Sequence, residues 1–194
     1  MEGRAKSPDA LVNAIGAYNS NPWGSQARIT TANPYIGDGA YSWVRTAVQY
    51  NPVGSGTNYY AEIGWWKDST GIHVHVVSNS PIEYFSLSYA PQPANGTTHT
   101  YQVFWNSGLN GYDLRYDGAL ITNRSASLTL TRVTCGGEAN SSANAIGIST
   151  CKRNKYANSS TGNWLLFPSH YNEAAPGYWV NDISASAWEV GGNN

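Results

Sequence analysis

The sequence predicts an all-β sandwich of two antiparallel sheets, and three observations support this prediction. Apolar residues alternate with polar ones over short runs, as is typical of strands with one buried face. Clusters of glycine, proline, asparagine and serine separate these runs at short intervals. No repeat or linker divides the chain. We therefore expect one domain over residues 9–194, with residues 1–8 as a remnant of expression or processing.

A helix is expected at one place near the N-terminus. Leu11, Val12 and Ile15 have helical spacing within residues 9–18, and Ser7-Pro8-Asp9 has the composition of a helix start. The sequence therefore predicts at most one short N-terminal helix.

From Tyr41 onward the pattern predicts strands. Trp43, Arg45, Ala47 and Gln49 share one face, and the opposite face is apolar. A proline- and glycine-rich loop at residues 51–56 should join this strand to residues 59–66 in a hairpin. Further strands are expected at residues 72–77, 84–89, 98–105, 112–116, 119–121, 128–133, 163–167 and 179–190, with Asp117-Gly118 as a type I′ turn and a loop-rich segment between the two cysteines.

Composition excludes several classes of partner. The formal net charge is −1 and only 12% of residues are charged, so we expect no basic surface for a phosphate backbone and no nucleic acid partner. No apolar run reaches the roughly 20 residues of a membrane span. Eight Trp and fourteen Tyr with few charges are typical of extracellular proteins, so we expect a secreted or cell-surface monomer.

The two cysteines, Cys135 and Cys151, are close enough in sequence to form a disulfide in an oxidising compartment. The alternative is a pair of buried thiols. A zinc site needs four ligands at short spacing, and His73 and His75 on one strand face supply only two. We therefore expect no metal and no cofactor.

The segment from Gln49 through Asn58-Tyr59-Tyr60-Ala61-Glu62-Ile63-Gly64-Trp65-Trp66 resembles the core of the eqolisin-type glutamic peptidases. The resemblance implies a concanavalin-like jelly-roll sandwich and a secreted endopeptidase acting on polypeptides. It also implies a catalytic pair made of Gln49 and a glutamate some eighty to ninety residues later, a position occupied by Glu138.

A second resemblance is to the neprosin domain. It rests on Asn58 to Trp65, on Gly162-Asn163-Trp164 and on Gly177-Tyr178-Trp179. This family is thought to use two glutamates, which makes Glu62, Glu138 and Glu189 the candidates. The two resemblances agree on the fold and differ on the pair.

A carboxylate and an amide hydrolyse a peptide when the carboxylate takes a proton from water and the amide positions that water and donates to the oxyanion. Glu138 and Gln49 would have these roles, with Glu62 as a second acid. Tyr60 and Trp66 share the Glu62 face and would line the substrate groove, and Trp105 is a further candidate for substrate binding.

Two alternatives stay open at this point. In the first, the protein is a non-catalytic glycan-binding module that uses exposed rings on a concave sheet, among them Trp65 or Trp66, Trp105 and Tyr112. In the second, Gln49 faces solvent, Glu138 stabilises a turn and the tryptophans belong to the core.

Overall fold

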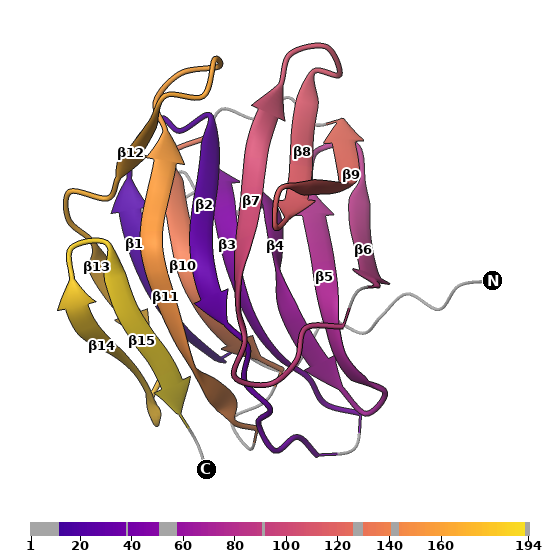
Figure 1. The fold of residues 1–194 in the computed structure, drawn as a ribbon, viewed down its shortest axis with the longest axis vertical. Coiled ribbons are helices and arrows are strands. Elements are labelled where there is room, and N and C mark those ends of the chain that lie inside the picture. Colours follow the sequence, from indigo (N-terminus) through magenta and orange to yellow (C-terminus); the bar gives the residue numbers. More distant parts are fainter. Residues whose placement is uncertain are drawn as a thin grey trace.

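Two antiparallel sheets packed face to face make up the fold of the computed structural model (Figure 1). The structure describes residues 12–37, 39–50, 58–90, 92–125, 130–140 and 144–192, without the side chain of Ser125. The expected remnant at residues 1–8 and the expected loop at 51–56 lie outside these residues.

The first sheet has the strand order β13-β1-β10-β3-β4-β5-β6. Its strands, in chain order, are β1 (Val12–Asn19), β3 (Ser42–Tyr50), β4 (Tyr59–Asp68), β5 (Gly71–Asn79), β6 (Tyr84–Tyr89), β10 (Arg132–Ala139) and β13 (Tyr171–Ala174).

The second sheet has the order β14-β15-β11-β2-β7-β8-β9, and β12 pairs with β11 beside this path. Its strands are β2 (Gly24–Thr30), β7 (Thr98–Asn106), β8 (Gly111–Tyr116), β9 (Ala119–Ser125), β11 (Ile146–Ala157), β12 (Trp164–Leu166), β14 (Tyr178–Ser184) and β15 (Ala187–Gly192). The predicted all-β sandwich is confirmed. The described part of the chain contains no helix long and apolar enough to span a membrane.

The expected N-terminal helix is wrong for the described residues, because β1 is a strand between β10 and β13. Ala14, Ile15 and Ala17 are all nearly or fully buried. A strand covered on both faces has apolar residues on both, so its pattern loses the alternation that identifies a strand. Pairing with two neighbours then outweighs the local preference for a helical turn.

The segment between the cysteines is more regular than predicted. Cys135 lies inside β10, and Cys151 lies inside the twelve-residue strand β11. The sequence pattern also gave no sign of β2 or β13. Glycine, serine and asparagine in these strands weaken the local β signal, so the pairing in the sheet determines their conformation.

The predicted hairpin of β3 and β4 is confirmed, with Gln49 opposite Tyr60 and Trp43 opposite Trp66. Val44 and Val48 are fully buried between the sheets, as the sequence predicts for the apolar face. The turn after β8 is also confirmed, since Asp117 (φ 46°) and Gly118 (φ 85°) both have the left-handed backbone of a type I′ turn.

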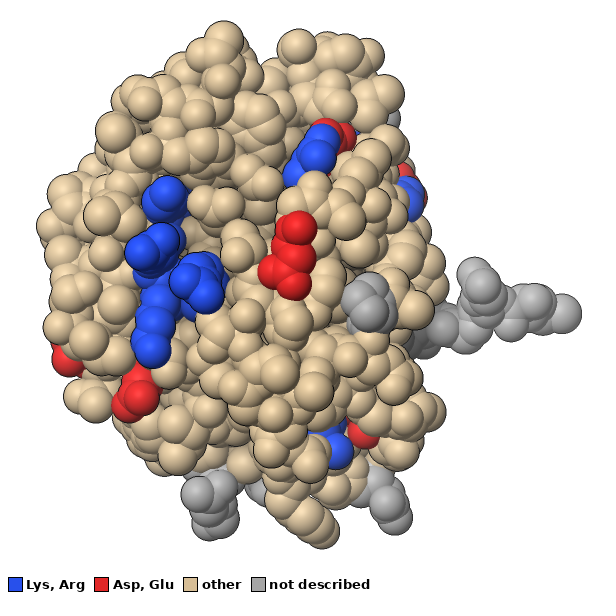
Figure 2. Space-filling view, viewed as in Figure 1, with Lys and Arg blue, Asp and Glu red and all other residues tan. Residues whose placement is uncertain are grey.

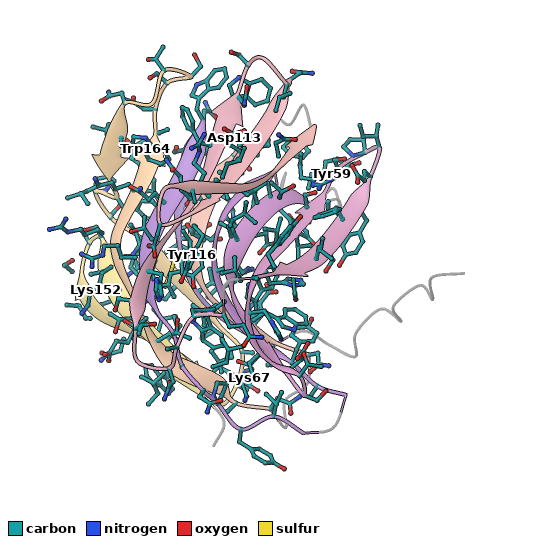
Figure 3. The ribbon with its side chains drawn as sticks, turned by 45° about the vertical axis from the view of Figure 1, so that its right-hand side comes forward. Tyr59, Lys67, Asp113, Tyr116, Lys152 and Trp164 are labelled. Carbon is teal, nitrogen blue, oxygen red and sulfur yellow. A yellow bond between two sulfur atoms is a disulfide. The ribbon has the colours of Figure 1, made fainter. Side chains whose placement is uncertain are left out.

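The core lies between the two sheets and is filled with large side chains (Figure 3). Trp65 and Trp188 are the largest fully buried residues. A hydrogen bond of 2.7 Å between the hydroxyls of Ser25 on β2 and Thr46 on β3 joins the sheets within this core. The sheet faces that point inward are thus fixed, and the opposite face of each sheet points outward.

The predicted disulfide between Cys135 and Cys151 is present, with 6.3 Å between the two Cα atoms. Both residues are fully buried. Because β10 and β11 belong to different sheets, the bond crosslinks the sandwich across its core.

We expect the double variant Cys135→Ala/Cys151→Ala to lose about 3 kcal/mol of unfolding free energy, because the crosslink restricts the unfolded chain. Urea denaturation with and without reductant measures this loss. Reductant should lower the midpoint of the parent protein and leave the variant unchanged. A parent protein that does not respond to reductant after unfolding would contradict the crosslink.

Candidate functional site

The outer face of the first sheet carries a cluster of charged groups at its centre, over β10, β3 and β4. Arg45 on β3 lies opposite Gly136 on one neighbouring strand and opposite Gly64 on the other. A Cβ atom at either glycine would meet backbone atoms of an adjacent strand. With no side chain on either side, the long arginine side chain has room to lie along the sheet.

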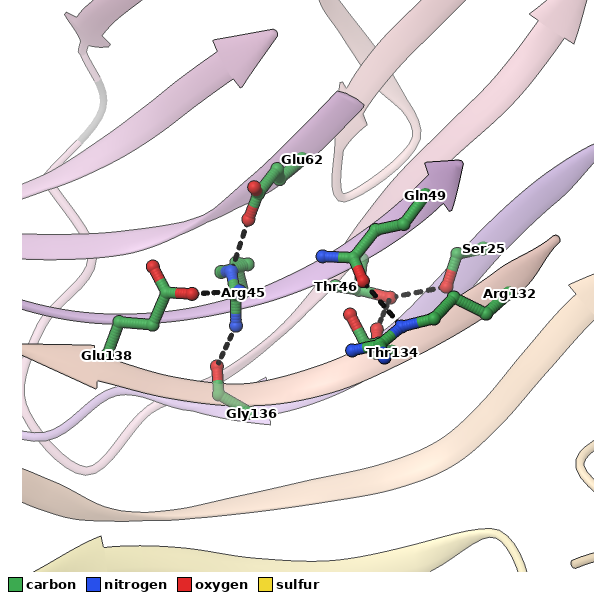
Figure 4. A network of polar contacts seen from close by, with 9 residues as sticks. All are labelled: Ser25, Arg45, Thr46, Gln49, Glu62, Arg132, Thr134, Gly136 and Glu138. Atoms are coloured by element: carbon green, nitrogen blue, oxygen red, sulfur yellow. Dashed lines mark hydrogen bonds and ion pairs between the residues drawn. The ribbon is translucent and has the colours of Figure 1, made fainter. Parts of the chain in front are cut away.

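Two glutamates contact this arginine from different strands (Figure 4). The Arg45 Nε donates to Glu62 on β4, and its Nη2 donates to Glu138 on β10. The Nη1 donates to the carbonyl of Gly136 at 3.3 Å. The structure thus brings together two of the residues predicted from the sequence, through a third that was not predicted.

The three side chains differ in exposure, at 1% for Arg45, 4% for Glu62 and 17% for Glu138. A buried ion costs several kcal/mol unless it is paired, so the guanidinium and the carboxylates need one another. Glu138 is the carboxylate that water reaches more readily.

Burial raises the pKa of Glu62 from its ordinary value of 4.5 to about 7, and the nearby charge of Glu138 acts in the same direction. Arg45 opposes this shift without cancelling it. For Arg45 itself, burial alone would lower the pKa, but the charges of Glu138 and Glu62 raise it. One guanidinium is therefore the counter-ion of two carboxyl groups. Glu62 keeps a proton at weakly acidic pH.

Aromatic side chains surround the acidic pair. Burial raises the pKa of both Tyr41 and Tyr60 above the ordinary range, helped by the charge of Glu138 at Tyr41 and of Glu62 at Tyr60. Both phenols are therefore neutral donors close to the carboxylates. Trp66 stacks between Tyr41, with ring centroids 4.0 Å apart, and His75, at 4.4 Å.

His75 is not a metal ligand in this arrangement. Its two ring nitrogens bind the hydroxyls of Ser88 at 2.8 Å and Ser86 at 3.0 Å. Burial lowers the pKa of His75 to about 4, so the ring is neutral at pH 7. Within the described ranges, no three His, Cys, Asp or Glu residues are placed to hold a metal ion.

Gln49 lies on the same outer face of the first sheet as Arg45, but its side chain contacts Arg132 and not the acidic pair. Its Oε1 accepts a hydrogen bond of 2.7 Å from Arg132 Nε, and the two other guanidinium nitrogens of Arg132 bind Glu173 at 3.1 Å. Figure 4 shows the Gln49 amide nitrogen turned toward the side on which Glu62 and Arg45 lie. Arg132 and Glu173 thus fix the orientation of this amide.

The expected pair of Gln49 and Glu138 is not brought together. Glu138 is opposite Trp43, whereas Gln49 is six residues further along β3. Six residues of strand span roughly 20 Å, which is too far for one bridging water. Gln49 is nearer to Glu62, which is opposite Ala47 on the adjacent strand.

Other candidates lie on the second sheet. Trp105 is on β7, where it packs edge-on against Trp23 with centroids 5.7 Å apart. Glu189 is on β15, opposite Thr150. Neither belongs to the first sheet that carries the acidic pair.

The rings that a glycan-binding surface would use are not collected on one exposed face. Trp65 is fully buried, and Tyr112 is 1% exposed in the core. The sequence could not distinguish these rings from exposed ones, since both kinds alternate with polar residues.

The strand pattern places Arg45 on the outer face of β3 but indicates no role for it. The available signal was a charged residue in the middle of a strand whose other residues are largely aromatic and apolar. Such a residue is buried only when it is paired. Tyr41 and Arg132 gave no comparable signal.

Among solved structures, two peptidases have a similar fold. A scytalidoglutamic peptidase bound to a peptide-based transition state analogue superposes with a TM-score of 0.58 and 11% identity, covering 95% of this chain and 98% of the other. SCP-B, an eqolisin peptidase in complex with the tripeptide Ala-Ile-His, gives a TM-score of 0.55 and 12% identity over the same shares. This chain has the eqolisin fold. No protein-family model and no curated protein matches its sequence.

Replacing Arg45 should destabilise the fold, because burying two carboxylates without a counter-ion costs free energy. We expect Arg45→Met to lose about 3 to 5 kcal/mol of unfolding free energy at pH 8, because both glutamates then lack their counter-ion. The loss should shrink at pH 5, where Glu62 holds a proton. Urea denaturation at both pH values measures it.

The matched control is Arg45→Met/Glu62→Gln/Glu138→Gln, which removes the charges together and should recover most of the stability. An Arg45→Met protein as stable as the parent at pH 8 would contradict the shared ion pair.

Glu62 should also impose a pH dependence on stability. Between pH 4.5 and about 7 the folded protein keeps a proton that the unfolded chain has released, so the unfolding free energy falls as pH rises. Glu62→Gln should remove this contribution, and Glu189→Gln should retain it. Denaturation midpoints across this window provide the measurement, and an identical pH profile for Glu62→Gln and the parent would refute the shift.

Proposed function

We propose that this protein is an endopeptidase in which Glu62 and Glu138 are the acid and base that activate water. The observation that carries this proposal is the convergence of a buried glutamate and a partly exposed one on Arg45, at the centre of an outer sheet face. A buried carboxyl group that holds its proton, beside a second carboxyl group that water reaches, is suited to general acid and base catalysis.

The roles follow from exposure and from protonation. Glu138, the more exposed carboxylate, takes a proton from a water molecule, whose oxygen bonds to the peptide carbonyl carbon. Glu62 holds a proton up to about pH 7 and gives it to the leaving nitrogen as the C–N bond breaks. Exchange with solvent then returns the proton from Glu138 to Glu62.

Neutral donors beside the pair would stabilise the oxyanion. The phenols of Tyr41 and Tyr60 stay protonated in their buried setting. Trp43, opposite Glu138, has an indole Nε1 that is buried and has no hydrogen-bond partner among the described residues. A donor of this kind is costly unless a ligand or water accepts its bond, so it favours substrate binding on this face.

This assignment agrees with the two-glutamate chemistry implied by the neprosin resemblance and changes the role of Gln49. We propose that Gln49, oriented by Arg132, contacts the substrate chain. Trp66 and Tyr60 would contact substrate side chains. The likeness to eqolisin peptidases, two of which are solved with peptide ligands or analogues, supports a polypeptide substrate.

The disulfide across the core supports a secreted or cell-surface location, since such bonds persist in oxidising compartments.

We expect Glu138→Gln and Glu62→Gln each to reduce cleavage of an unfolded protein substrate by about 100-fold or more, because each removes one proton-transfer step. Thermal midpoints should change little, since Arg45 keeps one carboxylate partner in either variant. Glu189→Gln, on the other sheet, should retain full activity. The parent rate should fall as pH rises through about 7, where Glu62 loses its proton.

Absence of cleavage by the parent between pH 2 and 8 would refute the proposal, as would full activity of Glu138→Gln. Saturable retention on insoluble polysaccharide by such an inactive parent would instead support a glycan-binding module.

A further inference from the structure

The outer face of the second sheet gathers four of the eleven Lys and Arg residues of the chain: Arg28 on β2, and Lys152, Arg153 and Lys155 on β11. Figure 2 shows them as a compact basic patch over these two strands. The prediction that the protein has no basic surface is wrong, because a net charge near zero says nothing about where the charges lie.

The sheet register aligns the patch in rows. Lys152 is opposite Arg28, which is opposite Thr100 on β7. Lys155 is opposite Gln26 in the next row. Neighbouring strands are about 4.8 Å apart, so each row places cations directly beside neutral hydrogen-bonding side chains.

A β-bulge places two successive cations on this face. Lys152 to Lys155 spans three residues of β11 while the partner strand advances by two, and Arg153 has a φ of 50°. Asn154, 1% exposed, fixes the bulge by donating from Nδ2 to the carbonyls of Cys151 at 3.2 Å and Ser186 at 2.9 Å. Bulges commonly redirect side chains at functional sites.

The cations surround a shallow hollow of about 200 Å³, lined by Gln26, Arg28, Thr100, Arg153 and Lys155. Figure 3 shows Lys152 projecting away from the packed sheets. The hollow thus presents both charged and neutral hydrogen-bond donors to solvent.

The positive charge of the patch is not neutralised by ion pairs within the described residues, since none of those observed includes its four cations. Two acidic residues border it. Asp117 is occupied by His99 Nδ1 at 2.7 Å and by the backbone N–H of Thr100 at 2.8 Å. Glu189 is opposite Thr150, two residues before Lys152.

We propose that this patch binds a linear carboxylated polysaccharide. Guanidinium and ammonium groups pair with carboxylates, and the Gln26 amide and the Thr100 hydroxyl suit sugar hydroxyls. A single-stranded nucleic acid would need rings for base stacking, and the hollow is lined by none. The patch lies on the sheet opposite to the acidic pair, so polysaccharide binding leaves the first sheet accessible.

The test uses polygalacturonate, a chain of uronic acids, titrated into the full protein at low salt. We expect saturable binding that weakens as salt rises. Arg28→Gln and Lys155→Gln should each raise Kd by about two- to five-fold, the range for one exposed charge contact. Lys67→Gln, at the far end of β4, changes the net charge equally and should bind like the parent.

Three results would overturn the proposal. The first is no binding of polygalacturonate, and the second is an equal loss of affinity in the patch variants and in Lys67→Gln. The third is an oligonucleotide that binds to the patch more tightly than polygalacturonate does. Neutral dextran should not bind, and dextran binding that matches polygalacturonate would also overturn it. Because peptide hydrolysis is measured separately, failure here leaves the proposed peptidase activity intact.

Discussion

The first sheet and its candidate site depend on the ion pairs of the buried Arg45 guanidinium with Glu62 and Glu138. Two carboxylates from different strands would repel each other at the centre of a sheet without a cation between them. Burial keeps a proton on Glu62, and Arg45 does not cancel this effect, because one positive charge faces two acidic groups. The same contact therefore links side chains of β10, β3 and β4 and fixes the positions of the two glutamates that we propose as acid and base.

Each sheet has one face in the common core and one face with a separate chemistry. The first sheet presents acids, phenols and indoles, and the second presents cations and amides. The Ser25–Thr46 hydrogen bond and the disulfide join the two sheets inside the core. The contacts between the sheets therefore involve the inner faces, and the outer face of each sheet points away from them. A chain of 194 residues can thus carry two outer faces of unlike chemistry.

The sequence predicted the elements whose strands have one apolar face, such as the β3–β4 hairpin, and the type I′ turn at Asp117-Gly118. It missed β1 because apolar residues occur on both of its faces, and β11 because a bulge interrupts its alternation. Glu62 and Glu138 were both predicted as candidate residues, and the structure shows that both contact Arg45. Their meeting point was not predicted, because the place of β10 between β1 and β3 is a non-local pairing that no sequence spacing reveals.

The strand order has a consequence for how the protein is made. β10 follows β4 by more than sixty residues and yet inserts between β1 and β3, so the sheet cannot close until the chain has been synthesised past Ala139. Until then Arg45 has only one of its carboxylate partners. A nascent or truncated chain would therefore lack the complete acidic pair, and a peptidase of this design would be inactive while its own backbone is still unfolded and open to cleavage.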